Sequence, residues 1–401
     1  MNPSTKNQIN NKHFLILFMF FLSVVLLNSY ISSVYPLIAL LMLGCFYLFC
    51  KNQYRFHYLV FAWLINIVYI MVRTVTWNQD NIKINLSFVI GFLFFWVMYR
   101  QKIELSIIFN RYIKFFAIAI GMLSPLIQLL LPGLSAWSSE ETVGFLGRTH
   151  YVVMVAFLGV AYCFFCMTKH PLVKTMVSLL AIVVVMLSGS RSNLITIPFS
   201  IGLVYLIDSA RGETIKRIFK ILLILIIVVV LFFIIGNYFQ FRTFIRIQES
   251  IERYTRGLDI SNGRSGLQEM AWRDFKSEPI WGIGWMNFSD YHIGEHYENY
   301  NVHNFYLQLL CELGITGAIL ILFPMLWMLI SDISFVRKTP FIEAKKKIRI
   351  SLAYQIYYLV SSILHATSYD SIYIILYFVF VTYSCSIKYW AYKENRIGVM
   401  E

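Results

Sequence analysis

The chain has 401 residues, of which 58% are hydrophobic and only 14% are charged, and its mean hydropathy is +0.65. A soluble domain of this size cannot bury so much apolar side-chain surface, so the composition excludes an ordinary soluble enzyme. It predicts an all-α, polytopic membrane protein. The formal net charge of +13 does not indicate nucleic-acid binding, because most basic residues lie in segments that are predicted to face the cytoplasm.

Twelve segments are long and apolar enough to be predicted as membrane-spanning helices. They lie at about residues 14–31, 34–50, 57–72, 84–99, 112–132, 151–168, 172–188, 192–208, 218–236, 304–330, 349–366 and 369–390. The segment at 84–99 is short, and a few polar residues set the boundary between the last two. The first segment resembles a signal peptide but lacks a small-residue cleavage site, so we expect an uncleaved signal anchor.

The distribution of lysine and arginine predicts the orientation of these spans, since cytoplasmic segments are enriched in both. With a cytoplasmic N-terminus, inside segments hold 23 of the 34 basic residues and short outer loops hold only four. We therefore expect both termini in the cytoplasm and one large helical loop outside, between spans nine and ten. The expected regions are 1–236 with nine spans, the outer loop at 237–302, and 303–401 with three spans and a tail.

Cysteine and glycine patterns exclude several kinds of site. All six cysteines fall within predicted spans, so a disulfide framework is not expected. Cys163 and Cys166 have metal-like spacing but no companion pair, and buried packing is the better interpretation. The chain has no glycine-rich phosphate loop, so it has no ATPase engine. We predict no metal and no cofactor.

The predicted topology gathers polar side chains from distant parts of the sequence on the outer face. They are Arg148, His150, Arg191, the loop arginines, His303, His365 and Asp370. Arg191 lies in a turn of a few residues at the membrane surface, where an unpartnered charge is costly. The positive-inside bias also disfavours an arginine there, so a functional role is favoured over a snorkelling side chain. His365 and Asp370 are predicted to pair across a turn in a supporting role.

Two helices are predicted in the outer loop. Residues 241–256 carry apolar side chains at helical spacing with interleaved arginines, which is typical of an amphipathic surface helix with solvated charges. The second helix is predicted to begin at a capping box, Ser265-x-x-Gln268, and to end at Glu278-Pro279. Arg264 then precedes a helix N-terminus, where a guanidinium and backbone N–H groups would together favour a bound anion such as phosphate.

Two tryptophans near the end of the loop and the residues at the start of the tenth span are further candidates for function. Trp281 and Trp285 suit either a membrane interface or a sugar-stacking surface, and the sequence leaves both interpretations open. At the start of the tenth span, His303 has the right side chain for a general base. Behind it, Asn304, Gln308 and Glu312 are predicted to form a polar stripe running into the bilayer, with a structural role favoured for Glu312.

Three motifs in this order resemble the O-antigen ligase and polymerase superfamily of bacterial envelope enzymes. They are Ser188-Gly189-Ser190-Arg191-Ser192, the run Gly263-Arg264…Trp272…Pro279-x-x-Gly282-x-Gly284, and His303-Asn304-x-x-Leu307-Gln308…Glu312-x-Gly314-x-x-Gly317. The twelve-span layout with one large loop also resembles this family. The resemblance covers about residues 140–320.

The resemblance implies a metal-independent, inverting glycosyl transfer at the outer leaflet of the bacterial inner membrane, with the large loop in the periplasm. The donor would be a glycan on undecaprenyl diphosphate. The acceptor would be lipid A-core in a ligase, or a second lipid-linked repeat unit in a polymerase. By motif position, Arg191 and Arg264 would bind the diphosphate and His303 would activate the acceptor. Asn304, Gln308, Glu312, Arg148, His150, His365 and Asp370 would be supporting residues.

Two other classes of function remain possible from sequence. A transporter or flippase for anionic or lipid-linked solutes would also have many spans, but its polar residues should lie near mid-membrane. A structural scaffold would leave Arg191, Arg264 and His303 replaceable. The single large outer loop favours a ligase over a polymerase, and no residue identifies the acceptor.

Overall fold

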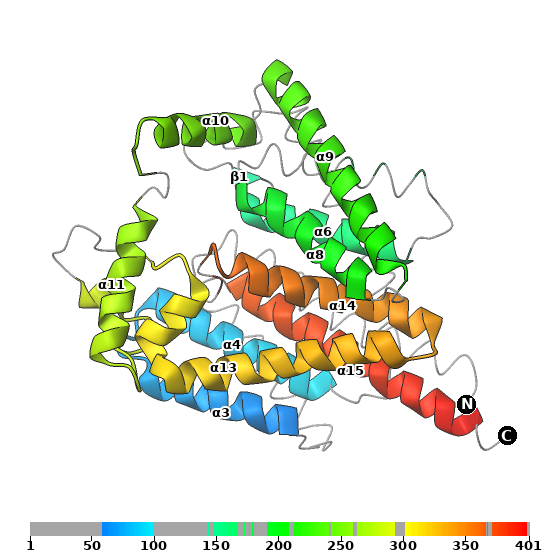
Figure 1. Ribbon diagram of the computed structural model, residues 1–401. Helices are drawn as coiled ribbons and strands as arrows, with labels where there is room; N and C mark the ends of the chain where they lie inside the picture. Colours follow the sequence, from blue (N-terminus) through cyan, green and yellow to red (C-terminus); the bar gives the residue numbers. More distant parts are fainter. Residues whose placement is uncertain are drawn as a thin grey trace. The chain divides into compact units, whose positions relative to one another are not determined.

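The computed structural model describes only part of the chain. The described residues are 58–98, 143–144, 147–166, 172, 176, 179, 191–207, 212–239, 242–259, 263–292, 301–365, 367 and 371–398. Their helices are α3 (Tyr58–Arg73), α4 (Gln79–Met98), α6 (Thr149–Cys166), α8 (Arg191–Ile207), α9 (Thr214–Phe239), α10 (Arg242–Thr255), α11 (Arg264–Ser277), α12 (Phe288–Tyr291), α13 (Phe305–Lys338), α14 (Ile342–Ser361) and α15 (Ser371–Gly398) (Figure 1). Two strands that the sequence did not predict, β1 (Val143–Gly144) and β2 (Gly147–Arg148), form a small antiparallel pair.

Helices occur at eight of the predicted spans, with ends shifted by a few residues, as in α4, which begins at Gln79. Within the described residues, three helices are long and apolar enough to cross a membrane, at Asn81–Met98, Phe305–Lys338 and Tyr373–Lys393. Those at Tyr58–Arg73 and Arg191–Ile207 are apolar but shorter. The predicted spans 14–31, 34–50, 112–132 and most of 172–188 lie outside the described residues. The count of twelve and the outer position of the loop therefore stay predictions.

The chain divides into two compact units. Unit 1 comprises residues 1–104, 261–331 and 358–389 and includes α3, α4, α11, α12 and most of α13 and α15. Unit 2 comprises residues 105–260, 332–357 and 390–401 and includes α6, α8, α9, α10 and most of α14. Each unit thus combines segments that are far apart in the sequence.

In unit 1, aromatic side chains and one glycine bring α3, α4 and α15 together. The Trp63 ring of α3 is almost fully buried and lies 4.7 Å from the Phe378 ring of α15, centroid to centroid. A Cβ atom at Gly91 of α4 would lie only 2.3 Å from the same phenyl ring. Glycine at this position therefore permits the close approach of α4 and α15, as small residues commonly do between membrane helices.

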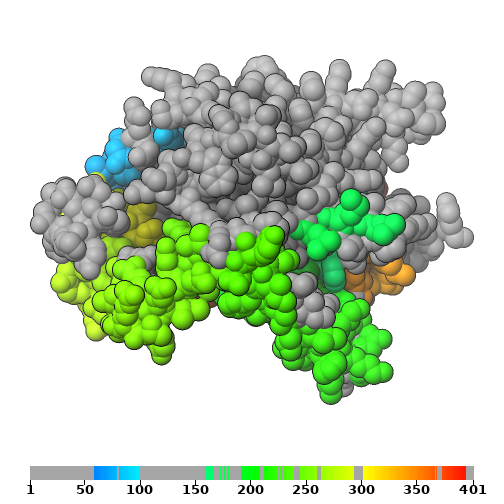
Figure 2. Space-filling view, turned by 90° about the horizontal axis from the view of Figure 1, so that it is seen from above, coloured from blue at the N-terminus to red at the C-terminus, as the bar shows by residue number. Residues whose placement is uncertain are grey.

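In unit 2, buried polar groups and stacked rings hold α8 and α14. Tyr357 of α14 donates a 2.8 Å hydrogen bond to Asn193 Oδ1 of α8, and its ring stacks on Phe157 of α6 at 4.6 Å. The amphipathic helix predicted at 241–256 is confirmed as α10. Its Phe244 is buried against Phe232 and Gly236 of α9, while Ile251 and Tyr254 are exposed. The part of the chain that contains α10 is coloured green at the surface in Figure 2.

The predicted span at 304–330 is a helix with a break in it. Gly314 has φ 66° and ψ −172°, so the backbone hydrogen bonds of α13 are interrupted there. We call the segment Pro279–Trp285 the strap, because its backbone fills this break. Ile283 N and Gly284 N donate to the carbonyls of Cys311 and Glu312, at 3.0 and 2.9 Å.

The backbone N–H groups that follow the break also find hydrogen-bond acceptors in the strap. Ile315 N donates to Pro279 O at 2.9 Å and Thr316 N to Ile280 O at 3.3 Å. From α3, Tyr69 Oη donates to Leu313 O at 3.0 Å. Because an unpaired buried peptide group is costly, these five bonds explain how α13 tolerates its break.

Gly314→Ala should disrupt this junction. A Cβ atom there would lie 2.2 Å from Ile280 O, on a residue with positive φ. We expect a loss of more than about 3 kcal/mol of stability, because both strain and a backbone clash contribute. Thermal unfolding of the purified protein would measure it.

Gly257→Ala is the matched control, since Gly257 has φ 70° but nothing within 4 Å of its Cβ position. It should cost only about 1–2 kcal/mol, the price of a left-handed residue alone. Equal melting temperatures for the two variants would contradict the clash.

Candidate functional site

Two of the three predicted site residues, Arg264 and His303, come together in unit 1. Arg264 is the first residue of α11, and its guanidinium is close enough to His303 to change the titration of the imidazole. The predicted capping box is wrong: Gly263, with φ 82°, is the N-cap residue and makes no side-chain cap bond. Glycine is favoured at this position because its backbone adopts left-handed φ without strain. The predicted end of the helix is confirmed, with Glu278 as the C-cap residue.

His303 is held in an unusual backbone conformation immediately before α13. Its φ is 55°, in the left-handed region that residues with a side chain rarely adopt. Such strain costs of the order of 1–3 kcal/mol and is often found at functional positions. Burial, and secondarily the nearby Arg264 guanidinium, lower the pKa of His303 below its ordinary value of 6.5. The imidazole is therefore neutral near pH 7 and can accept a proton.

The segments on either side of His303 fix its position. Asn304 is the N-terminal cap of α13, because its Oδ1 accepts a hydrogen bond from Leu307 N at 3.1 Å. Phe305 N donates to Ser362 O at 2.9 Å in the turn after α14. Arg264 Nη1 lies 3.5 Å from Leu364 O, a long contact, next to His365 in the same turn. Arg264, His303 and the 362–365 turn thus meet in unit 1.

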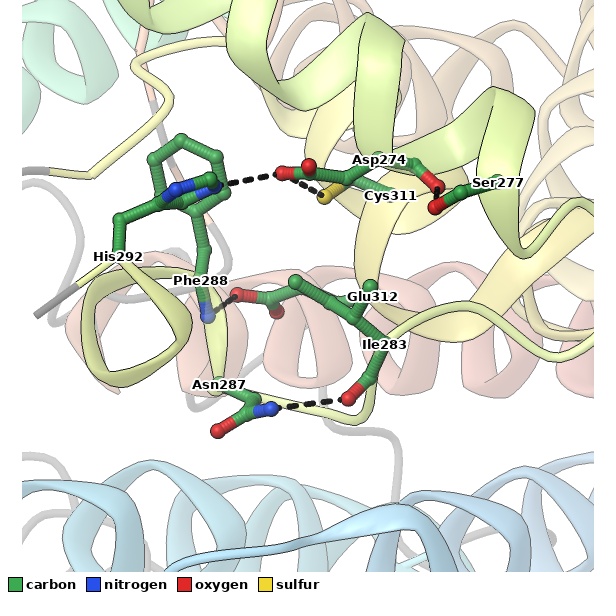
Figure 3. Close-up of polar contacts among 8 residues, drawn as sticks. All are labelled: Asp274, Ser277, Ile283, Asn287, Phe288, His292, Cys311 and Glu312. Atoms are coloured by element: carbon green, nitrogen blue, oxygen red, sulfur yellow. Dashed lines mark hydrogen bonds and ion pairs between the residues drawn. The ribbon is translucent and has the colours of Figure 1, made fainter.

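Gln308 and Glu312 are fully buried, and their contact places them on one face of α13, as the predicted polar stripe requires. The depth of this stripe in the bilayer stays a prediction. Glu312 Oε2 accepts a hydrogen bond from Met286 N at 2.9 Å. Its Oε1 accepts one from Phe288 N at 3.3 Å, which Figure 3 shows. Gln308 Nε2 donates to Oε1 at 3.4 Å. The carboxylate therefore holds the residues between the strap and α12, at the N-terminus of that short helix.

The structure adds a buried histidine–aspartate contact that sequence analysis missed. His292 Nε2 lies 2.7 Å from Asp274 Oδ2 of α11, and both side chains are almost fully buried (Figure 3). Cys311 Sγ of α13 lies 3.9 Å from the same oxygen. The available signal was Asp274 itself, a charge on the same helix face as Leu267 and Ala271. The pair links α11 to the end of α12.

Arg191, in unit 2, meets arginines that were predicted to be merely solvated. As the first residue of α8, it donates a hydrogen bond to Ser250 Oγ of α10. Its guanidinium lies close enough to Arg246 and Arg253 to interact electrostatically, with Glu249 as an acidic neighbour. This arginine cluster (Arg191, Arg246 and Arg253) has an excess of positive charge, which attracts anions.

Unit 2 also has an apolar cavity of about 420 Å³, lined by α8, α9 and one residue of α10. Its lining starts at Leu194, one turn after Arg191, and includes Ile247, next to Arg246. The rest of the lining comes from α8 and α9, including Pro198, Phe199, Phe232 and Phe233. The volume is within the range of ligand-binding pockets. Unit 2 thus combines a cluster of cations with an apolar hollow, an arrangement that suits an amphiphilic anion.

For the remaining predicted residues, the structure gives only their positions in the fold. Arg148 ends β2 and His150 lies in the first turn of α6. Asp370 lies outside the described residues, so its predicted pairing with His365 stays a prediction. In the described ranges, no group of three or more His, Cys, Asp or Glu side chains is arranged to hold a metal ion.

Glu312→Ala should destabilise the protein, because it leaves the buried N–H groups of Met286 and Phe288 without their acceptor. Each such loss costs about 1–3 kcal/mol. Glu312→Gln retains one acceptor oxygen and should lose less. Glu269→Ala, at an exposed position of α11, serves as the control and should unfold like the parent. A Glu312→Ala melting temperature equal to that of the control would disprove the bracing role.

Comparison with known families gives one match. A family model described as O-Antigen ligase matches residues 176–322, a range that contains Arg191, Arg264 and His303. A search of curated proteins found no match. The match and the apolar helices together identify an integral membrane protein. Residues 176–322 of this chain therefore form a domain of the O-antigen ligase/polymerase superfamily.

Proposed function

We propose that the protein is a glycosyltransferase that moves a glycan from undecaprenyl diphosphate to an acceptor hydroxyl at the outer leaflet of the bacterial inner membrane. Ligation to lipid A-core is the leading form of this reaction. Extension of a second lipid-linked repeat unit is the alternative within the same superfamily. The termini would be cytoplasmic and the loop at 237–302 periplasmic.

The observation that carries the proposal is the pairing of Arg264 with a neutral His303. A base that accepts the acceptor's proton must be uncharged at working pH, and the lowered pKa of His303 meets that need. A cation beside it can stabilise the negative charge that develops on a departing diphosphate. One position in unit 1 therefore offers both groups that a glycosyl transfer from a diphosphate requires.

In the proposed reaction, His303 takes the proton of the acceptor hydroxyl as its oxygen attacks the anomeric carbon. The bond from that carbon to the diphosphate oxygen breaks, and its electron pair leaves with undecaprenyl diphosphate. Attack from the face opposite the leaving group inverts the anomeric configuration. Arginine guanidinium groups supply planar, permanently charged donors for the phosphate oxygens.

The lipid-linked nature of the donor is supported by unit 2. The arginine cluster suits a diphosphate, and the apolar cavity along α8 and α9 suits the start of a prenyl chain. A water-soluble sugar nucleotide would not use such a hollow. A transporter is expected to have its polar binding site near mid-membrane. The arginine cluster and the apolar cavity do not require such a site.

A transfer assay with two acceptors tests the proposal. Purified protein in liposomes would receive undecaprenyl-diphosphate glycan with either lipid A-core or a second lipid-linked repeat. Product with only lipid A-core identifies a ligase, and chain growth with the second acceptor identifies a polymerase. Absence of transfer with both acceptors, together with donor transport across the vesicle, would refute the proposal.

The arginine cluster gives a prediction about rate. Arg191→Ala and Arg246→Ala should each lower transfer by about 100-fold or more, the usual effect of removing a donor from a developing negative charge. Arg256→Ala is the control, because Arg256 is largely exposed and faces Glu252 at 4.0 Å. Full activity in Arg191→Ala would remove the cluster from the mechanism.

The pKa of His303 gives a prediction about pH. Since the unprotonated imidazole is the active form and its pKa is lowered, the acid limb of the rate profile should lie below pH 6.5. Arg264→Gln removes a cation that lowers this pKa, so the limb should move to higher pH in addition to any loss of rate. Arg273→Gln, an exposed position on α11, should leave the limb in place. An unmoved limb in Arg264→Gln would contradict the electrostatic coupling of Arg264 to His303.

A further inference from the structure

The break in α13 divides a helix that is too long for a membrane. α13 has 34 residues, which at 1.5 Å per residue is about 51 Å, whereas the hydrocarbon core is about 30 Å thick. The part after the break, from Ile315 to Val336, measures about 33 Å before the charged pair Arg337 and Lys338. The length of this part alone matches the thickness of the hydrocarbon core. The residues from Phe305 to Leu313 therefore extend beyond the core.

The helix after the break has an exposed apolar stripe. Ile315, Ile319 and Phe323 recur every four residues and are 46%, 61% and 59% exposed. Side chains at this spacing lie on one helix face. In a membrane-spanning helix such a face contacts lipid.

The strap continues this stripe at its outer end. Ile280 and Trp281 are 57% and 53% exposed, and the Ile280 carbonyl accepts the hydrogen bond from Thr316 N. The next residues turn inward: Gly282 and Trp285 are buried, and Trp285 Nε1 donates to Asn85 Oδ1 at 3.0 Å. Two apolar side chains of the strap are thus presented outward where the lipid-facing stripe begins.

The neighbouring end of α3 has the same character. Trp285 N donates to Arg73 O at 2.8 Å, and Arg73 Nη2 donates to Gly282 O at 2.7 Å. Just beyond, Val75 and Trp77 are exposed. Tryptophan and arginine at the end of an apolar stripe are typical of the membrane–water interface.

We infer that the strap is a membrane-interface anchor, with Ile280 and Trp281 inserted among the lipids of the outer leaflet and the break at Gly314 marking the edge of the hydrocarbon core. α11 and the first part of α13 (Figure 1) then lie beyond the hydrocarbon, at the level of the lipid headgroups. Arg264 and His303 are held at that depth by the four backbone hydrogen bonds between the strap and α13 and by the bond from Tyr69 Oη to Leu313 O. This inference does not rest on the proposed reaction.

A glycan-binding surface is the competing interpretation of Trp281. The exposed apolar side chains at this end of α13 and the strap are aliphatic, namely Ile280, Ile315 and Ile319. The polar group beside Trp281 is the Arg73 guanidinium, whose Nη2 donates to the Trp281 carbonyl at 3.1 Å; an arginine next to a tryptophan is also typical of a membrane interface. Trp272 of α11 differs, since its exposed ring lies 5.7 Å from Lys276 Nζ and next to exposed Arg273. Trp272 is therefore a matched control that should stay in water.

Spin-label depth measurements test the anchor. Trp281→Cys, Trp272→Cys and Ile319→Cys would carry a nitroxide in liposome-reconstituted protein, with the labelled parent subtracted for native cysteines. Relaxation by oxygen should exceed relaxation by a water-soluble nickel chelate at 281 and 319, and the order should reverse at 272. The same order at 281 as at 272 would overturn the inference.

A second measurement covers the case in which Trp281→Cys does not fold. Brominated lipids should quench the tryptophan fluorescence of the wild type more than that of Trp281→Phe, whereas Trp272→Phe should not reduce the quenching. Equal quenching in wild type and Trp281→Phe would overturn the anchor. So would protection of Trp281 by a soluble glycan together with no quenching by lipid.

Discussion

The contact between two glycine backbones supports the rest of unit 1. Gly282 of the strap lies against Glu312 and Gly314 of α13, so that a Cβ on either glycine would overlap backbone atoms. Only this close approach lets the strap supply hydrogen bonds to the break in the helix. The break in turn directs Glu312 toward the loop, where its carboxylate holds the start of α12. Without this close approach, the peptide groups of the strap and of α13 would lose their hydrogen-bond partners.

From this junction, buried polar contacts extend to the candidate site. Glu312 fixes the segment before α12, and the Asp274–His292 pair joins the end of α12 to α11. α11 begins at Arg264, and α13 begins just after His303, with Phe305 bonded to the turn after α14. His303 can therefore keep a strained backbone, because the elements on both sides of it are fixed independently. The proposed base and the neighbouring cation are therefore held by independently fixed elements.

The cations divide between the two units according to their surroundings. Arg264 lies beside an imidazole whose pKa it helps to lower, a setting for proton transfer and charge stabilisation. Arg191 lies with Arg246 and Arg253 in the unit that also has the apolar cavity, a setting for an anionic head and a hydrocarbon tail.

The sequence alone determined the helical membrane class and the positions of most described helices, because apolar runs are local signals. It also singled out Arg264 and His303 as candidate site residues, because charged and titratable side chains are rare in such a chain. Only the tertiary structure decided that Gly314 interrupts α13, that Glu312 serves the loop, that Gly263 caps α11, and that Trp285 is buried while Trp281 is exposed. Each of these depends on a partner at a large sequence separation, such as Gly282 against Gly314 or Asp274 against His292. Spacing within one segment carries no information about such partners, since the energy that selects them arises only when the segments pack.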